Sequence, residues 1–371
     1  MKTISLLCLG SRASAFTDHF FTICENLDAL DLYSLNVLTS VKCLPSLRKQ
    51  SLLVDAINYT KARPLTAFYG LIKWRRLIFS QHGSLFLYGE VPQHIPFAFL
   101  CRARLVSHVA DPVTHPGVPL VMRIAFYFAK LIFILKSEYV YVSYEAGRLS
   151  LLRSFSLLFK FFINESKVRV VPFAQLNSVA TALGEGLVSS LEDFDQDLVF
   201  FGRNEKYKGL DWAIRNLDEW CVSRDVSLAL LVVSSGGLVL PRLQRLSVDI
   251  LSQYLPDDQF VRVVSSSRFA LFPYSHATGS HVVINSNSCG VPVIASSVGC
   301  FVDQVRDGIN GFLFDALDSA SFYDALDRAF LGGKARGALP DTSSLVEYAK
   351  ASFSSEKEAL ELRLMLDSLS D

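Results

Sequence analysis

The chain has 371 residues, of which 50% are hydrophobic and 12% aromatic, so it contains enough apolar material for two domains of ordinary size. Its seven cysteines include no Cys-x-x-Cys pair, which argues against a zinc site and a disulfide framework and favours a reducing compartment. It has no run of about eighteen uncharged apolar residues, so no transmembrane helix is predicted.

The formal net charge of zero hides a strong asymmetry between the halves of the chain. Residues 1–170 carry 20 Lys and Arg against 10 Asp and Glu, and the remaining residues carry 16 against 26. This difference supports a division into two domains and suggests that the N-terminal half meets an anionic partner. Attraction between the two halves across a cleft is the alternative explanation.

Short apolar runs alternate with helical patterns along the chain. The predicted strands are 3–9, 84–89, 105–110, 139–143 and 168–171 in the first half, and 198–201, 228–233, 261–264, 269–272, 291–295 and 311–314 in the second. The first run follows Lys2 and superficially resembles a secretion signal, but it is short and Arg12 precedes the would-be cleavage site, so a buried strand is predicted. The alternation predicts α/β domains with parallel sheets and right-handed crossovers.

The expected join between the domains lies at 172–197, where a stretch containing Pro, Ser and Gly gives way to an acidic cluster. We therefore expect an N-terminal domain at 1–175 and a C-terminal domain at 176–354. The last segment, 355–371, is expected to form a polar helix.

Residues 198–211 are the most informative stretch. An apolar strand ends at Gly202, two cations follow at Arg203 and Lys208, and Gly209 precedes a helical pattern that begins at Leu210. A strand, a basic glycine-containing loop and a helix start hold phosphate in α/β proteins, because side-chain cations and helix amides converge on one anion. The stretch therefore predicts an anion site.

A second segment, 269–314, contains three short strands and supplies a plausible second half of this site. Its loop at 275–280 ends the first strand and precedes a helix predicted over 282–289. Thr278 and Ser280 are suitable N-cap residues, and Gly279 permits a ligand to approach the backbone closely.

Together the two segments resemble the C-terminal domain of the family 4 glycosyltransferases. The matching pieces, in the family's order, are Gly202-Arg203, Lys208-Gly209, Pro273-Tyr274, the loop and helix at 277–285, and the segments 289–296 and 307–311. The resemblance implies the GT-B fold, which is an α/β fold of two Rossmann-like parallel-sheet domains facing a cleft. It also implies a nucleotide-diphosphate sugar as the donor, and a C-terminal helix at 355–371 that packs back across the domain junction.

The resemblance assigns the diphosphate of the donor to the catalytic cations Arg203 and Lys208, next to Gly202. Fixed cations stabilise the charge that develops on the leaving group, and Arg can fork across two phosphate oxygens. Amides at Gly279–His281, at the helix start, complete the phosphate site. Because these groups neutralise the diphosphate, no metal or other cofactor is expected.

The family's usual pair of glutamates, eight positions apart, is replaced here by Ala277 and Asn285. Asn285 retains the ability to bond ribose hydroxyls, whereas Ala277 has no polar side chain. The Pro-Tyr-x-x-Ala-Thr-x-Ser form resembles a subset of bacterial envelope-polysaccharide transferases, in which Ser280 and backbone amides around Thr278 take over contacts to the sugar or phosphate. The replacement also motivates an inactive relative as an alternative.

Two groups of acidic residues have both a functional and a structural interpretation. Asp303 aligns with a frequent family glutamate and is predicted to cap the next helix, with donor contact as the alternative. Asp193, Asp195 and Asp197 match the Asp-x-Asp spacing of metal-dependent transferases, but they precede a strand, whereas ligands in such sheets lie after strand ends. A solvated acidic linker is therefore the preferred interpretation.

The acceptor side is predicted from residues 108–117, which follow an apolar strand and end in a Pro-Gly turn. His108, Asp111 and His115 are expected to face the cleft. Residues 110–117 resemble the His-Asp-Pro-x-Pro-His-x-Gly stretch of the same bacterial subset, with Ala110 in place of its first His. Asp111 and His115 are candidates for contacts to the acceptor hydroxyl or the transferred sugar. The alternative has Asp111 capping a turn and His115 bonded to backbone.

Two N-terminal segments, 66–80 and 121–136, are basic and aromatic. Such segments can lie in an anionic membrane interface and bring an enzyme to a lipid-linked acceptor. For the second, which places Arg123 and Lys130 on one helical line, a buried core helix with a thin polar stripe is an equal alternative.

The sequence thus predicts a retaining glycosyltransferase that moves a sugar from a nucleotide-diphosphate donor to a glycan or lipid-linked glycan acceptor in polysaccharide biosynthesis. It is expected in the cytoplasm, with peripheral contact to the inner face of the membrane and no nucleic-acid partner. An inactive GT-B partner subunit that binds nucleotide is the alternative.

Overall fold

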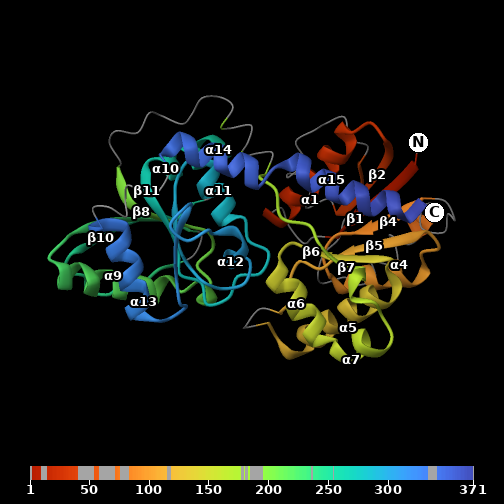
Figure 1. Cartoon of the computed structure of the whole chain (residues 1–371), viewed down its shortest axis with the longest axis horizontal. Helices are drawn as coiled ribbons and strands as arrows, with labels where there is room; N and C mark the ends of the chain where they lie inside the picture. The colour runs from red at the N-terminus through yellow and green to blue at the C-terminus, as the bar shows by residue number, and fades with distance from the viewer. Residues whose placement is uncertain are drawn as a thin grey trace. The chain divides into compact units, whose positions relative to one another are not determined.

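The computed structural model describes residues 2–9, 15–40, 54–57, 72–75, 83–114, 118–176, 179, 183, 195–234, 237–253, 255–332 and 341–370. The chain divides into two compact units (Figure 1). The first contains Met1–Leu176 and Ser355–Asp371, and the second contains Asn177–Ser354.

The first unit is built on a seven-stranded sheet whose strands are all parallel. Its strands are β1 (Lys2–Cys8), β2 (Tyr33–Ser40), β3 (Val54–Ile57), β4 (Ser84–Leu87), β5 (Arg104–His108), β6 (Tyr139–Val142) and β7 (Val168–Val170). Their order is β3-β2-β1-β4-β5-β6-β7, and Leu6 on the central β1 pairs with Val37 on one side and Phe86 on the other. The order reverses between β1 and β4, where open α/β sheets bind ligands.

Helices cover both faces of this sheet (Figure 1). The helices of the unit are α1 (Ala15–Ala29), η2 (Pro92–His94), α4 (Ile95–Leu100), α5 (Leu120–Lys136), α6 (Glu145–Ser154), α7 (Ser156–Phe161), η3 (Glu165–Lys167), α15 (Ser355–Asp367) and η7 (Ser368–Ser370). Alternate residues of β1 point to opposite faces: Leu7 joins a core with α4 to α7, whereas Leu6 joins a core with α1 and α15.

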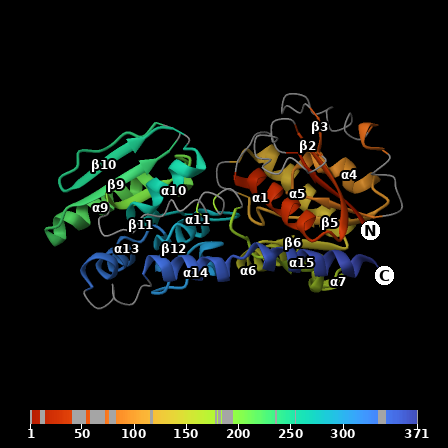
Figure 2. The same cartoon turned by 90° about the horizontal axis from the view of Figure 1, so that it is seen from above.

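The second unit contains a six-stranded sheet, again with all strands parallel. Its strands are β8 (Gln196–Phe201), β9 (Leu228–Val233), β10 (Leu246–Leu251), β11 (Ser267–Phe272), β12 (Val293–Ser296) and β13 (Gly311–Phe314). The order β10-β9-β8-β11-β12-β13 reverses between β8 and β11 and leaves β10 at one edge (Figure 2). Both sheets confirm the prediction of two Rossmann-like parallel-sheet domains.

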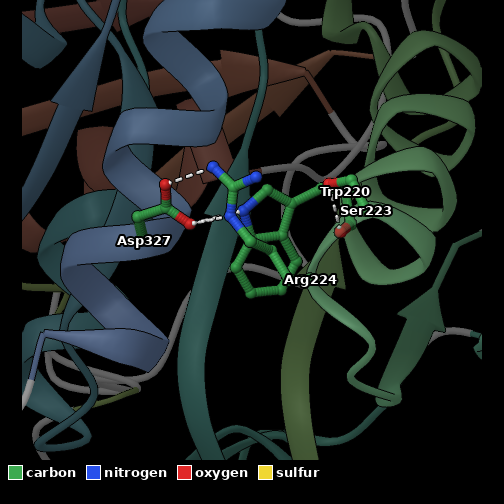
Figure 3. A network of polar contacts seen from close by, with 4 residues as sticks. All are labelled: Trp220, Ser223, Arg224 and Asp327. Atoms are coloured by element: carbon green, nitrogen blue, oxygen red, sulfur yellow. Dashed lines mark hydrogen bonds and ion pairs between the residues drawn. The ribbon is translucent and has the colours of Figure 1, made fainter.

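The helices of the second unit are η4 (Lys206–Lys208), α9 (Leu210–Arg224), α10 (Asp257–Ser265), α11 (Val282–Ser288), α12 (Phe301–Gln304), α13 (Ser319–Leu326), the π-helical segment η5 (Asp327–Leu331) and α14 (Thr342–Ser352). On one face, the indole of Trp212 on α9 stacks at 6.2 Å on Phe314 and lies 5.3 Å from Phe322 of α13. A polar network joins α9 to η5 as well (Figure 3): Asp327 accepts bonds from Trp220 Nε1 at 2.9 Å and from Arg224 Nε at 2.9 Å and Nη2 at 2.6 Å.

The structure contains three strands that the sequence did not predict and one helix in place of a predicted strand. The segment 261–264, predicted as a strand, lies inside α10, where Val261 and Val264 are three residues apart on the buried face. Pro256 as N-cap and the carboxylates of Asp257 and Asp258 in the first turn favour the helix, because negative charge stabilises a helix N-terminus. The strands β2, β3 and β10 were not predicted.

Candidate functional site

The loop after β8 places a lysine over a glycine. Gly202 has a φ of +127°, and a Cβ at this position would lie 2.5 Å from Lys208 Nζ. A side chain at position 202 would therefore occupy the place of the ammonium group, and only glycine also accepts this φ without strain. Gly202 and Lys208, which the sequence places together, are thus in direct contact.

Lys208 is a buried cation, with only 8% of its surface exposed. Its Nζ lies 5.0 Å from the centre of the Tyr274 ring, at the end of the neighbouring strand β11. Within the described part of the chain, its ammonium makes no ion pair or hydrogen bond. Burial, aided by the nearby Arg203 and opposed by Glu205, lowers the pKa of Lys208 to about 8.

Arg203 is the exposed partner of this pair. Its Nη1 lies 3.2 Å from Glu205 Oε1, and the two side chains are 55% and 44% exposed. An exposed ion pair of this kind contributes little free energy, so the guanidinium can exchange Glu205 for a stronger anion at small cost. Arg203 and Lys208 together present two cations at the carboxyl end of β8.

The loops that follow β8 and β11 are locked together. Gly209 has a φ of +68°, and a Cβ there would lie 2.1 Å from the carbonyl oxygen of Pro273. The carbonyl of Tyr207 accepts bonds from the Ser275 amide at 2.7 Å and from the Ser275 hydroxyl at 3.1 Å. These contacts fix the cationic loop at the point where the strand order of the sheet reverses.

Hydrogen bonds from the segment that contains α12 fix the 277–280 loop. The carbonyl of Ala277 accepts a bond from Cys300 N at 2.9 Å, and that of Thr278 accepts one from Cys300 Sγ at 2.8 Å. The carbonyl of Ser280 accepts a bond from Gln304 Nε2 at 2.9 Å. Three carbonyls of the loop are therefore directed toward α12, which leaves Gly279 in a loop of defined position.

The approach of this segment depends on Gly299. Gly299 has a φ of +52°, and a Cβ there would lie 1.6 Å from the carbonyl oxygen of Ala277. No other residue type fits so close to a backbone oxygen without displacing one of the two segments.

The helix caps differ from those expected. The N-cap of α11 is His281, without a side-chain capping bond, so neither Thr278 nor Ser280 caps this helix. The N-cap of α12 is Cys300, and Asp303 is an exposed residue in its first turn rather than its cap. The 277–280 loop is instead fixed by the backbone amide and Sγ of Cys300 and by the side-chain amide of Gln304.

Asn285 lies on α11 with an unsatisfied oxygen. Its Oδ1 is buried and has no hydrogen-bond partner among the described residues. A buried amide oxygen without a partner is costly, and a ligand hydroxyl would satisfy it. This property agrees with the ribose contact expected of Asn285, which the structure itself does not test.

The acidic residues before β8 have structural partners where they are described. Asp197 belongs to β8 and accepts bonds from Ala229 N at 3.0 Å and from Arg268 Nη1 at 2.8 Å. It therefore joins neighbouring strands and is not part of a solvated linker. Asp193 lies outside the described residues, and within the described ranges no group of His, Cys, Asp and Glu could hold a metal ion.

In the first unit, His108 lies in the core, contrary to the prediction that it faces a cleft. It is the last residue of β5, is fully buried, and stacks at 4.4 Å on Tyr141 and at 4.5 Å beside Tyr88. Its Nε2 lies 3.2 Å from Ser143 Oγ, and burial holds the pKa of His108 well below its ordinary value. Because β5 has strands on both sides, its last side chain packs between aromatic rings.

Asp111 is positioned by Glu90, a residue that the sequence did not single out. The buried carboxylate of Glu90 accepts the amides of Ala110 at 2.8 Å and Asp111 at 3.0 Å. Burial, followed by the charge of Asp111, raises the pKa of Glu90, while Lys130 opposes the rise. His115, the second expected acceptor residue, lies outside the described residues.

His94 fixes the ends of two central strands at the same edge. Its Nδ1 donates to the carbonyl of Gly89 at 2.9 Å, and its Nε2 accepts the Leu9 amide at 3.1 Å. Burial lowers the pKa of His94 to about 4, which maintains this neutral form. The sequence feature that could have identified Glu90 and His94 is their position just after the predicted strand 84–89, because the end of this strand lies beside the end of the strand 105–110.

Three comparisons with known proteins agree with this geometry. Residues 195–330 match the family model described as glycosyl transferases group 1. The D-inositol 3-phosphate glycosyltransferase of Acidothermus cellulolyticus is 28% identical over 145 residues, which are 35% of this chain and 32% of that relative. The match thus spans about a third of the length of that curated relative.

Solved structures resemble the whole chain. HepE from Anabaena, in complex with UDP-glucose, superposes with a TM-score of 0.71 at 12% identity and covers 99% of this chain and 100% of its own. TarM from S. aureus, in complex with Fondaparinux, alpha-GlcNAc-glycerol and UDP, superposes with a TM-score of 0.70 at 12% identity and covers 100% of both chains.

Two parallel-sheet Rossmann-like units with such structural neighbours define the GT-B fold. Residues 195–330 match the glycosyl transferases group 1 family, and this match confirms their resemblance to family 4 glycosyltransferases. No helix within the described residues is long and apolar enough to cross a membrane.

Proposed function

We propose that this protein is a retaining glycosyltransferase that takes a sugar from a nucleotide-diphosphate donor. The observation that carries the proposal is the buried ammonium of Lys208, which lacks an anionic partner among the described residues and lies beside Arg203 at the switch point of the second sheet. A diphosphate bound there supplies the missing counter-charge. The family match of residues 195–330 supports the same assignment.

In the proposed reaction, the bond between the anomeric carbon of the sugar and a diphosphate oxygen breaks, and the nucleoside diphosphate leaves. Arg203 and Lys208 stabilise the negative charge that grows on the bridging oxygen. Asn285 accepts a hydrogen bond from a ribose hydroxyl through its buried Oδ1. Two side-chain cations supply the charge that a divalent metal supplies elsewhere, so the proposal includes no metal or other cofactor.

The acceptor hydroxyl then bonds to the anomeric carbon on the face from which the diphosphate leaves. Its proton passes to a phosphate oxygen of the leaving group, so the configuration is retained. Asp111, held by Glu90 through its backbone amide, is the proposed contact to the acceptor or the transferred sugar, together with His115. The burial of His108 removes it from the proposed contacts.

We propose a glycan or lipid-linked glycan of polysaccharide biosynthesis as the acceptor, reached at the inner face of the membrane. Two of the structural neighbours are described with UDP, one of them also with alpha-GlcNAc-glycerol, and these names are compatible with such donors and acceptors. The nucleotide base and the sugar are not specified by the described residues.

One observation favours a second candidate, a GT-B subunit that binds nucleotide without turnover. Ala277 stands where the family carries a glutamate, is buried, and has its carbonyl tied to Cys300. Its side chain offers the donor sugar no polar contact. NMR of the anomeric proton, which detects free sugar or glycoside released from the donor, distinguishes the two candidate functions. A transferase releases such a product, whereas an inactive partner subunit releases none.

The experiment that tests the donor site is calorimetric titration of UDP, GDP and ADP into the full chain. We expect one nucleotide to bind, and Arg203→Ala and Lys208→Ala each to weaken it about tenfold or more, or roughly 1.4 kcal/mol. Arg215→Ala, an exposed arginine on α9, is the matched control and is expected to bind like the parent. Absence of binding by any of the three nucleotides would overturn the donor site.

A further inference from the structure

The helix α5 has the opposite side-chain distribution to an ordinary surface helix: it buries a charged residue and exposes apolar ones. Its one buried charged residue, Lys130, is directed inward, where Nζ donates to the carbonyl of Pro112 at 3.3 Å and to Thr114 Oγ1 at 3.4 Å. Its exposed side chains over the first nine residues are apolar, apart from Arg123. The exposed apolar residues there are Leu120, Val121, Met122, Ile124, Tyr127 and Phe128.

The short helix α7 extends this apolar surface. Leu157, Phe161 and Phe162 are 73%, 61% and 80% exposed. The ring of Tyr127 stacks at 4.8 Å on Phe155, the residue before α7, so the two helices are in contact. Both lie on the same side of the first sheet (Figure 1). We call the exposed residues of α5 and α7 the apolar face.

Within its two helices, the apolar face carries cations and no carboxylates. Within α5 and α7 the exposed charged residues are Arg123, Lys136 and Lys160, and neither helix contains Asp or Glu. The Nζ of Lys136 lies 5.4 Å from the Phe99 ring, and that of Lys160 lies 5.3 Å from the Phe161 ring. Long cationic side chains beside exposed aromatic rings are typical of a membrane interface, where the ring enters the acyl boundary and the charge meets a headgroup.

We propose that the apolar face binds the surface of an anionic lipid bilayer. The inner side of α5, with Ala129, Phe133 and Ile134, is buried, and Phe133 and Ile134 pack in the core of the unit, so the helix lies along the bilayer instead of entering it. A large exposed apolar surface is costly in water, and anionic headgroups complement its three cations. A second copy of the chain fits less well, because a two-fold contact of this face with itself would bring like charges together.

The inference rests on the proposed function only in taking the acceptor to be lipid-linked. Its test is independent of turnover. The full chain is sedimented with vesicles of phosphatidylcholine and phosphatidylglycerol, and with vesicles of phosphatidylcholine alone. We expect binding to the anionic vesicles that weakens with added salt, and little binding to the neutral ones.

Matched variants locate the contact. Phe161→Ser/Phe162→Ser is expected to weaken vesicle binding roughly tenfold or more, because two exposed rings no longer leave water. Leu360→Ser/Leu364→Ser removes two apolar residues that are 50% and 57% exposed on α15, on the other face of the sheet, and is expected to bind like the parent. Arg123→Glu is expected to weaken binding, whereas Arg215→Glu on α9 in the second unit is not.

Three results would overturn the proposal. They are failure of the parent to sediment with anionic vesicles, equal binding by the face and control variants, and a dimer by light scattering that Phe161→Ser/Phe162→Ser dissociates. Nucleotide titration on the same preparations keeps the two proposals apart. Intact nucleotide binding without vesicle binding rejects the membrane face alone, and vesicle binding without nucleotide binding rejects the donor site alone.

Discussion

Lys208 differs from most buried lysines, because no described carboxylate forms an ion pair with its ammonium and the nearby Glu205 only partly opposes the fall of its pKa. The fall of its pKa from 10.5 to about 8 corresponds to a cost of about 3 kcal/mol for keeping the ammonium charged in the folded protein. A structural lysine would be placed at the surface, where this cost vanishes. Binding of the proposed diphosphate would offset this cost.

Nucleotide binding is expected to depend on the proton of Lys208. Below pH 8 the side chain is charged and ready for the diphosphate; above pH 8 the free protein loses this proton, and binding must restore it. The dissociation constant for the nucleotide is therefore expected to be nearly constant from about pH 7 to 7.5 and to rise roughly tenfold per pH unit above 8. Calorimetric titrations across this range measure it.

The control for this prediction is Lys208→Met, which removes the titrating group and is expected to give weak binding without the alkaline rise. Arg203→Ala should weaken binding and keep the rise. A dissociation constant for the parent that stays flat to pH 9.5 would contradict the assignment of Lys208 to the diphosphate.

At the residue scale, the sequence predicted proximity best for residues that belong to one loop. Gly202, Arg203 and Lys208 lie within seven residues, so a strand followed by a helix brings them together. Glu90 was missed because it meets Asp111 only through the pairing of β4 with β5. His108 was placed wrongly because burial of the end of a central strand depends on both neighbours, which supply Tyr88 and Tyr141.

Among the elements, the contact between the 277–280 loop and the loop before α12 determines the shape of the candidate donor site. It depends on the absence of a single methyl group at Gly299, which lies against the carbonyl of Ala277. The same carbonyl accepts the Cys300 amide, so any displacement at Gly299 also breaks this bond. The backbone contact at Gly299 thus adds to the side-chain bonds of Cys300 and Gln304 that couple the loop to α12.

Gly299→Ala is expected to destabilise the second unit by about 1–3 kcal/mol, because the new methyl group clashes with a backbone oxygen and φ is unfavourable for alanine. Nucleotide affinity is expected to fall as well, because the loop must move. Urea unfolding and calorimetry measure the two effects. Gly237→Ala is the control, since a Cβ there meets nothing within 4 Å. Equal stability of the two variants would show that the contact is dispensable.

The central strands were predicted from composition because buried parallel strands are continuous apolar runs. The strands β3 and β10 lie at sheet edges, where the apolar signal is weaker, and β10 contains Ser247 and Asp249. The segment 261–264 was predicted as a strand because three of its four residues are valine. The preceding Pro256 and two aspartates outweigh this preference by stabilising the helix start.

For the molecule as a whole, the decisive feature is that α15 belongs to the first unit although it follows the second unit in sequence. Leu362, Met365 and Leu366 enter the core that β1 and α1 form. Inside this core, Glu358 Oε1 lies 2.6 Å from His19 Nε2, and both side chains are buried. The last helix therefore contributes both apolar and polar contacts to the first unit.

Leu362→Ala is expected to destabilise the first unit by about 2–4 kcal/mol, because it opens a cavity in this core. Hydrogen exchange followed by mass spectrometry should show weaker protection in β1 and α1 peptides and unchanged protection in the second unit. Leu360→Ala, on the same helix and 50% exposed, is the matched control. Equal protection in both variants would contradict the role of α15.

The position of α15 also sets the order in which the protein matures on the ribosome. The first unit begins to emerge before the second, yet its core lacks α15 until the second unit has been synthesised. The second unit, continuous in sequence, can fold while the first still exposes Phe20, Phe21 and their neighbours. The nascent first unit thus exposes part of its core for as long as the second unit is being synthesised, and a chain that stalls before α15 has emerged would contain only one finished unit.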